Sequence, residues 1–177
     1  MSPRRILAMM TATAALIAGP VLTAQASAPL PNTFSEQTRA AGLTAAQAAE
    51  LRQRVDAVLV SDPQARQISA NKLAIAGGDL VLRAPGRSET RDLAAPDAAL
   101  ACADGHLCIR DGLGDNYDYY YCGYYDFGGV GDGTFNNNQS SGTRARFYNQ
   151  NGSERWSNVA KDSGTASWTP VYHIRPC

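Results

Sequence analysis

The pattern of hydrophobic and polar positions changes its period several times along the chain. Residues 43–60 carry apolar side chains at helical spacing, at positions i, i+4, i+7 and i+8. The members of this stripe are Leu51, Val55, Val58 and Leu59. Thr44 and Gln47 stand at the spacing of a capping box. The pattern therefore predicts a helix over residues 43–60.

Residues 67–86 alternate with a period of two instead. Leu73 and Ile75 precede a turn at residues 77–79, and Leu80 and Leu82 follow it, which predicts a β-hairpin. The predicted helix and hairpin, residues 43–83, are too small to bury a core of their own. They could dock on the domain that follows, act as a pro-segment, or serve as a spacer. Residues 84–100 are rich in Pro, Ala and charge and predict a linker.

From Cys102 onward, short strand-like pieces alternate with turn clusters. The strand-like pieces are "HLCIR", "YDYYYCGYY", "TRARFYN", "SERWSNV" and "WTPVYHIRP". The turn clusters are "DGLGDN", "DFGGVGDG", "NNNQSSG" and "NQNG". This alternation of strands and turns is typical of an all-β domain. A domain of the size of residues 101–177 suits a small sandwich that needs covalent cross-links. We expect a mainly β domain over residues 101–177.

The first residues have the layout of a secretory signal peptide. Arg4 and Arg5 precede an apolar stretch, and small residues before Ala26 and Ala28 predict cleavage after one of them. Residues 1–28 are therefore predicted to be a signal peptide, and the alternatives are an uncleaved membrane anchor and a twin-arginine signal. Residues 29–42, rich in Pro, Ser, Thr and Ala, are predicted to be disordered. The expected location is secreted and extracellular, with no membrane association after cleavage.

The charge of the chain narrows the classes of partner. Cleavage would remove two of the 16 basic side chains and none of the 16 acidic ones, which leaves a net charge of about −2. A nucleic-acid binder would instead show a concentrated basic patch. We therefore expect no nucleic-acid partner.

The cysteines predict disulfides. An even number of cysteines in an exported chain favours oxidation. They are Cys102, Cys108, Cys122 and Cys177. Three connectivities are possible, of which sequential pairing is the simplest. A zinc site from Cys102, His106, Cys108 and Cys122 is the alternative, although Cys-x3-His-x-Cys is not a usual zinc-finger spacing.

Residues 101–177 resemble a known family of secreted proteins. The resemblance rests on the C-x5-C spacing, the aromatic strand that ends in cysteine, "NNNQSSGTRARFYNQNGS", the tryptophan that follows, and the terminal "WTPVYHIRPC". These features are similar to actinobacterial proteins grouped with the Streptomyces-type metalloproteinase inhibitors, peptidase-inhibitor family I36. The resemblance implies a βγ-crystallin-like fold, in which Greek-key strands form a small disulfide-stapled sandwich. It also implies an extracellular metalloprotease as the partner.

The chain departs from the family pattern at two places. Arg110 stands where the family often has an aromatic residue, and "DGLGDN" shortens the turn that follows. No segment matches the inhibitors' reactive segment residue by residue. The resemblance therefore supports the fold more strongly than the inhibition.

"NNNQSS", residues 136–141, fits the signature of βγ-crystallin calcium sites. The family pattern assigns roles to the main-chain carbonyl of Asn137, the hydroxyl of Ser141 and their neighbours Asn136 and Ser140. Such a loop would turn oxygens toward one hard cation. The hexapeptide holds no carboxylate, so we expect weak binding of Ca2+. The alternative is an Asn-rich hairpin whose amides bond its own backbone.

"DNYDYYYCGYYDFGG", residues 115–129, holds six of the eight tyrosines. Side chains alternate between the faces of a strand, so Tyr120 and Tyr124 would share the core face with the buried Cys122. The opposite face would then carry Tyr117, Tyr119 and Tyr121, which is suited to a protein, peptide or cell-wall glycan partner. Alternatively, residues 43–83 cover this face.

The chemistry-bearing residues do not predict an enzyme. The chain has two histidines and neither a GxSxG elbow nor an HExxH motif. Its Gly-flanked aspartates are typical of turns. The leading hypothesis is a peptidase inhibitor that presents a rigid loop or tyrosine surface to a metalloprotease. The alternatives are a calcium- or glycan-binding extracellular protein without inhibitory action and a structural or stress-related secreted protein.

Overall fold

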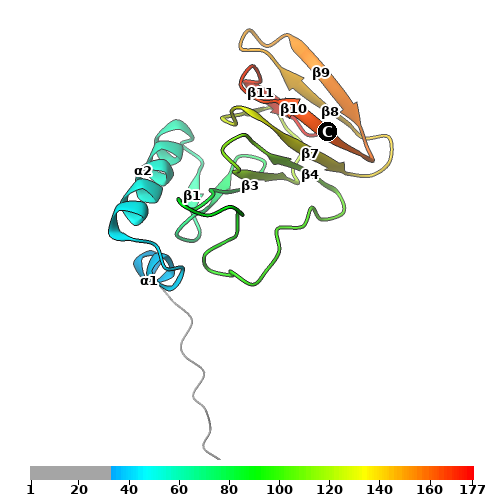
Figure 1. Ribbon diagram of the computed structural model, residues 1–177. Coiled ribbons are helices and arrows are strands. Elements are labelled where there is room, and N and C mark those ends of the chain that lie inside the picture. The colour runs from blue at the N-terminus through cyan, green and yellow to red at the C-terminus, as the bar shows by residue number, and fades with distance from the viewer. Residues whose placement is uncertain (1–32) are drawn as a thin grey trace, which may run out of the picture.

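The computed structural model describes residues 33–177, so the predicted signal peptide, residues 1–28, lies outside the described residues. Two helices lie to one side of the strands (Figure 1). The elements are α1 (Phe34–Ala40), α2 (Ala45–Ser61), β1 (Arg66–Gln67), β2 (Lys72–Ile75), β3 (Gly78–Val81), β4 (His106–Arg110), β5 (Asn116–Tyr119), β6 (Tyr125–Asp126), β7 (Asp132–Asn138), β8 (Arg144–Tyr148), β9 (Glu154–Val159), β10 (Asp162–Ser167) and β11 (His173–Arg175). The described part of the chain has no helix long and apolar enough to cross a bilayer.

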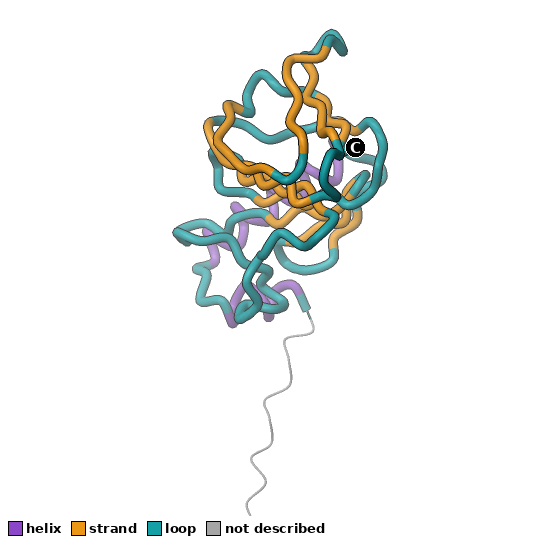
Figure 2. Tube along the Cα trace, turned by 90° about the vertical axis from the view of Figure 1, so that its right-hand side faces the viewer, coloured by secondary structure: helices purple, strands orange, loops and turns teal. Residues whose placement is uncertain are grey.

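The strands form two packed sheets, as expected for a small β sandwich. One sheet has the order β1-β2-β3-β5-β4-β7-β10 and the other the order β6-β11-β8-β9. Strands β4–β7 and strands β8–β11 make two four-stranded units, and each unit gives its third strand to the other unit's sheet. Each unit also pairs its first strand with its fourth, β4 with β7 and β8 with β11. This is the Greek-key pairing, and the strands gather in the upper part of the molecule in Figure 2.

The core lies between the two sheets and is rich in aromatic rings. Trp168 and Phe147 are fully buried. Phe147 of β8 stacks on Trp156 of β9 with ring centroids 3.9 Å apart. Phe135 of the first sheet meets Trp156 of the second at 5.6 Å. Burial of each such ring stabilises the fold by roughly 2–3 kcal/mol, and ring contacts add about 1 kcal/mol.

The helix predicted over residues 43–60 is confirmed as α2. Its N-cap residue Thr44 accepts a hydrogen bond from the Gln47 amide at 3.2 Å, and the Gln47 side chain accepts one from the Thr44 amide at 2.9 Å. This reciprocal pair is the predicted capping box. Leu51 and Val55 of the predicted apolar stripe are buried.

The predicted disorder of residues 29–42 is wrong within the described part of that range, because α1 spans Phe34–Ala40. A second capping box, between Thr33 and Glu36, starts this short helix. The Gln37 side chain then accepts a hydrogen bond from the Ala70 amide at 2.7 Å. Composition could not reveal this contact, because its two partners are 33 positions apart.

The predicted hairpin is also confirmed, but it is not a separate unit. Strands β2 and β3 pair with each other, and β3 then pairs with β5, with Leu80 opposite Tyr117. The predicted boundary between residues 43–83 and 101–177 therefore runs through one continuous sheet. The hairpin extends the sheet of the β domain, so a simple spacer role is excluded.

Helix α2 is tied to the same sheet by a partly buried ion pair. Arg54 donates to both carboxylate oxygens of Asp115, at 2.7 and 2.6 Å, and to the carbonyl of Arg83 at 2.8 Å. Asp115 also accepts the backbone amide of Arg83 at 2.8 Å. Asp115 is buried, so this bidentate pair holds the helix, strand β3 and strand β5 in one arrangement.

The predicted linker, residues 84–100, has no helix or strand but is packed against the sheet. Leu93 is buried, and its amide donates to the side chain of Asn71 at 2.9 Å. The same side chain donates to the carbonyls of Leu82 and Arg91, at 2.7 and 2.8 Å. One fully buried asparagine thus fixes the path of this segment.

Two strands lie in stretches that sequence reasoning assigned to turns or left unassigned. Strand β7 runs through "DGTFNNN" and pairs with β4 on one side and β10 on the other. Its inward positions are Gly133, Phe135 and Asn137, of which one carries a large apolar side chain. Strand β10, "DSGTAS", has none. Neither strand has the apolar alternation by which a strand is recognised.

Candidate functional site

The cysteines pair sequentially, as the simplest of the three connectivities predicts. Cys102 bonds Cys108 and Cys122 bonds Cys177. All four thiols are therefore used in disulfides, so the zinc alternative is wrong. In the chain-entropy model the longer loop contributes about 4 kcal/mol and the shorter one about 2 kcal/mol. The second bond joins the end of the chain to the middle of the tyrosine-rich stretch.

The predicted partner face is wrong for two of its three tyrosines. Tyr117 and Tyr119 are buried in the inner face of β5, whereas Tyr121 is 65% exposed. Tyr120 and Tyr124, expected in the core, are 37% and 48% exposed, and Cys122, expected to be buried, is also exposed. The prediction counts the alternation from Cys122, but β5 ends at Tyr119 and the chain then leaves the sheet. A period of two does not extend through such a break.

Residues 120–124, "YYCGY", form an irregular segment that we call the tyrosine loop. Its start is held by the hairpin turn, because the amides of Tyr120 and Tyr121 both donate to the carbonyl of Gly77 at 3.1 Å. Its centre is held by the Cys122–Cys177 disulfide. The N-terminal hairpin and the C-terminal residue therefore fix the same five residues.

The ring of Tyr125 packs against the tyrosine loop. Its hydroxyl donates to the carbonyl of Cys122 at 2.9 Å. The ring lies against Gly77 on the hairpin turn and Gly123 in the loop, and a side chain at either glycine would collide with it. These close approaches explain why glycine stands at both positions.

Tyr120 lies at the start of the loop, next to a polar group of side chains. Its hydroxyl donates to Asp79 at 3.3 Å, and its ring centroid is 5.1 Å from that of His106. His106 Nδ1 lies 2.7 Å from a carboxylate oxygen of Asp118. Partial burial raises the pKa of Tyr120, and the charge of Asp79 raises it further. The phenol therefore remains a hydrogen-bond donor near neutral pH.

Tyr124 lies at the other end of the loop and contacts a second histidine. Its ring is 5.1 Å from the rings of both Tyr148 and His173, and it is stacked on the latter. His173 Nδ1 lies 2.8 Å from Asp126. Each end of the loop thus carries an exposed tyrosine ring that rests on a histidine oriented by a carboxylate.

These histidines lack the nucleophile of a hydrolytic triad. Within residues 33–177, the hydrogen-bonded partner of each imidazole is an aspartate, and no hydroxyl is bonded to the second ring nitrogen. A triad needs such a nucleophile on the far side of the histidine. Each carboxylate fixes the position of its imidazole, and each imidazole contacts a tyrosine ring.

The residues of the predicted calcium site are divided between strand β7 and the turn that follows it, and calcium binding stays a prediction. Asn136 and Asn137 lie in β7, between β4 and β10, so their main-chain groups belong to the sheet ladder. Asn137 is fully buried, and its amide bonds the Asn158 side chain at 3.0 Å and accepts from Gln139 at 2.9 Å. Ser140 and Ser141 follow in the exposed turn. The Asn137 amide contacts Asn158 and the Gln139 side chain, not the backbone of its own hairpin as the alternative expects.

Sequence reasoning missed the supporting residues Gly77 and Tyr125. The glycine could have been found, because an isolated glycine within a strand-and-turn pattern often marks a close backbone approach. The identity of the approaching ring depends on the pairing of β3 with β5 and could not be read from the sequence.

Scans against protein-family models, curated proteins and solved structures find no match to the chain. Its function is therefore inferred from its own residues and their geometry.

Proposed function

We propose that the protein is a secreted, non-enzymatic peptidase inhibitor whose tyrosine loop enters the cleft of an extracellular metalloprotease. The observation that carries the proposal is the exposure of Tyr120, Tyr121 and Tyr124 on the tyrosine loop. Hydrogen bonds to Gly77, the Cys122–Cys177 disulfide and the hydroxyl of Tyr125 hold this loop in place.

The fixed shape of the loop favours binding without chemistry. A loop that is already held by a disulfide and by bonds to Gly77 and Tyr125 loses little conformational entropy when it docks. The same ties resist the distortion that cleavage of a peptide bond would need. Tyrosine adds a large contact area with few rotatable bonds, which is why it is common among residues that dominate interfaces.

The proposal is tested by titrating thermolysin with the full chain, purified with both disulfides formed. We expect residual activity on a peptide substrate to fall to zero near a molar ratio of one. Trypsin, which has no metal in its cleft, serves as the control enzyme and should keep its activity. Unchanged activity of thermolysin and of several other metalloproteases at excess protein would refute the proposal.

A further inference from the structure

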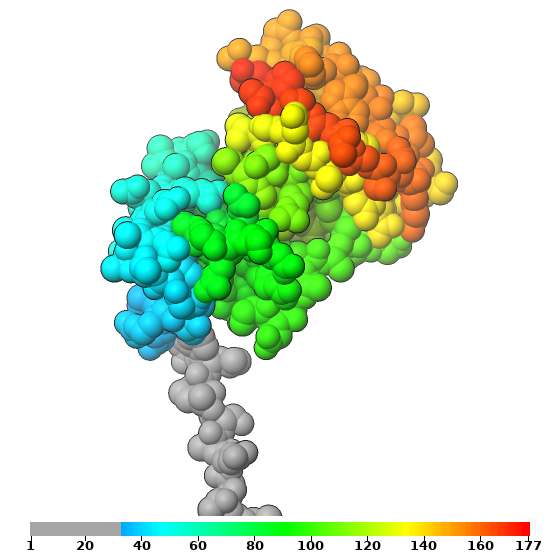
Figure 3. Space-filling model, in the orientation of Figure 1, coloured from blue at the N-terminus to red at the C-terminus, as the bar shows by residue number. Residues whose placement is uncertain are grey.

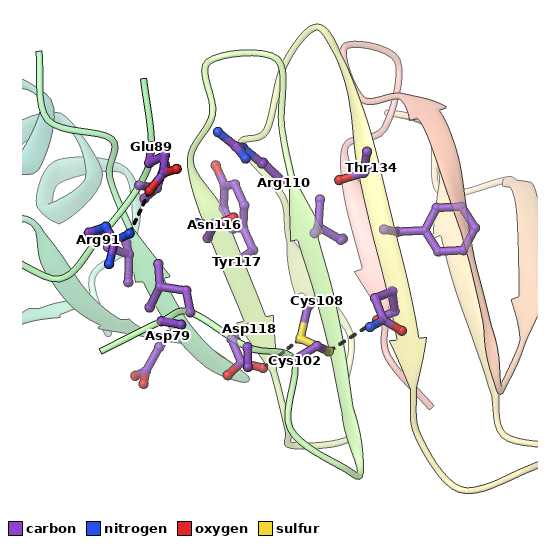
Figure 4. Close-up of a pocket in the computed structure, with 18 of the residues that line it drawn as sticks. Asp79, Glu89, Arg91, Cys102, Cys108, Arg110, Asn116, Tyr117, Asp118 and Thr134 are labelled. Carbon is purple, nitrogen blue, oxygen red and sulfur yellow. Dashed lines mark hydrogen bonds and ion pairs between the residues drawn. A yellow bond between two sulfur atoms is a disulfide. The ribbon is translucent and has the colours of Figure 1, made fainter. Parts of the chain in front are cut away.

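A groove of about 470 Å³ lies on the outer face of the larger sheet, away from the core. Its floor is made by β3, β5, β4 and β7, and its walls by residues 89–91 and 99–102 of the packed linker. Figure 4 shows these strands with the lining side chains, and Figure 3 shows a hollow between the green and yellow parts of the surface. The volume falls within the range of about 300–1,000 Å³ that is usual for ligand sites.

The strand register arranges the polar side chains of the groove in two rows. In one row Asn116, Arg110 and Thr134 stand opposite one another on β5, β4 and β7. In the other row Asp79 stands opposite Asp118, and Asn136 lies two strands farther on, beyond Cys108. Positions two apart on a strand share a face, so both rows line the same groove. The second row spans three strand spacings, roughly 14 Å.

The charges of the groove largely cancel. Lys72 lies 3.0 Å from Asp79, and Arg91 lies 2.8 Å from Glu89. His106 adds a partner for Asp118. The lining residues include as many basic as acidic side chains, since Arg110 balances Asp118. A strongly charged ligand, such as a nucleic acid, would find no matching field.

The groove instead offers many donors and acceptors side by side. Each carboxylate has room for about four hydrogen bonds and uses only part of that capacity on its ion-pair partner, Lys72 for Asp79, Arg91 for Glu89 and His106 for Asp118. The amides of Asn116 and Asn136 and the hydroxyl of Thr134 both donate and accept. Sugar hydroxyls, which also do both, match such a surface better than an apolar ligand does.

One aromatic ring lies beside the row of carboxylates. Tyr120 is partly exposed and is held by its hydroxyl on Asp79 and by its ring contact with His106. An aromatic face next to paired carboxylates and amides can stack on the apolar face of a sugar ring while its hydroxyls are bonded. We propose that this groove binds a neutral oligosaccharide, with Tyr120 at the border between the groove and the tyrosine loop.

The proposal is tested by calorimetric titration of the full chain with chitotetraose, cellotetraose and maltotetraose, and with a galacturonate oligomer as the acidic comparison. At least one neutral oligosaccharide should bind. The Asp118→Ala variant should then bind it about tenfold or more weakly, because a carboxylate acceptor is lost. The Asp79→Asn variant should also weaken binding, and it keeps the size of the side chain in case Asp118→Ala is poorly folded.

Asp126→Ala is the matched control, because Asp126 forms the same kind of pair with His173 outside the groove. This variant should bind the sugar like the wild type. Absence of binding by all three neutral oligosaccharides would overturn the proposal. Binding of the acidic oligomer alone would also overturn it. So would a sugar affinity in both the Asp118→Ala and Asp79→Asn variants that equals that of the wild type. None of these outcomes depends on inhibition of a protease.

Discussion

The side chain of Tyr119 is buried between two other tyrosine rings. Its ring centroid lies 6.4 Å from that of Tyr117 and 6.1 Å from that of Tyr125. Among the described residues its hydroxyl has no hydrogen-bond partner. Burial raises the pKa of this phenol well above its usual range, so it stays protonated. A buried hydroxyl without a partner costs about 1–3 kcal/mol of stability.

Replacement of Tyr119 by phenylalanine should therefore leave stability unchanged or raise it by up to about 1 kcal/mol. The measurement is the free energy of unfolding in urea. Tyr125→Phe is the matched control, because it removes a hydroxyl that is bonded to Cys122, and it should lower stability by about 1 kcal/mol. A loss for Tyr119→Phe as large as that for Tyr125→Phe would contradict this account.

Asp111 is a buried carboxylate whose ionisation should affect stability. Burial raises its pKa, although hydrogen bonds from the amides of Asp115, Val130 and Leu113 oppose the rise. The folded protein therefore holds this proton more tightly than the unfolded chain does. Its contribution to stability is fully present below the unfolded pKa, near 3.9, and is lost as pH rises through the folded pKa.

We expect the difference in unfolding free energy between the wild type and Asp111→Asn to change with pH. The wild type should lose stability relative to the variant as pH rises from about 4, since only the wild type has this proton to lose. The test compares urea unfolding of both proteins at several pH values, with NMR titration of the Asp111 carboxyl. A carboxyl that titrates below 3.8 would show that its hydrogen bonds outweigh its burial.

At the scale of elements, the hairpin β2–β3 positions the tyrosine loop through its turn. Gly77 has a positive φ of 87° and packs directly against the ring of Tyr125. Gly105 has the same φ, but a side chain there would meet no atom within 4 Å. A substitution at either glycine would therefore place a side chain in the same unfavourable backbone conformation. Only a substitution at Gly77 would also cause a steric clash.

Gly77→Ala should destabilise the fold by clearly more than Gly105→Ala. The left-handed conformation costs an alanine about 1–2 kcal/mol at either position. Only the Gly77 variant must also displace the Tyr125 ring, and with it the carbonyl contact to Cys122. Urea unfolding gives the two free energies, and tyrosine fluorescence reports the ring. Equal losses would mean that the hairpin turn does not support the loop.

The predictable elements are those whose signal is local. The capping box and apolar stripe of α2 and the alternation of β2 and β3 could be predicted because short segments determine them. The orientation of Tyr117 and Tyr119 could not, since it depends on where β5 ends. Strands β7 and β10 carry few apolar side chains and are held by backbone pairing with their neighbours. Their own sequences therefore do not identify them as strands.

At the scale of the whole molecule, the N-terminal segment and the β domain are one structure. Strand β3 completes the sheet beside β5, and Arg54 joins α2 to Asp115. The turn of the same hairpin bonds the tyrosine loop. Residues 101–177 alone would lose these contacts and expose the edge of β5, so the full chain is the proper material for every functional test.

The central claim is that the exposed rings of the tyrosine loop contact the protease. Its most direct test compares the inhibition constants of Tyr121→Ala and Tyr172→Ala with that of the wild type on thermolysin. Tyr121 lies in the loop, and Tyr172 is an exposed tyrosine outside it. We predict at least a roughly tenfold weaker inhibition for Tyr121→Ala and no change for Tyr172→Ala. Equal inhibition by the wild type and both variants would contradict the account.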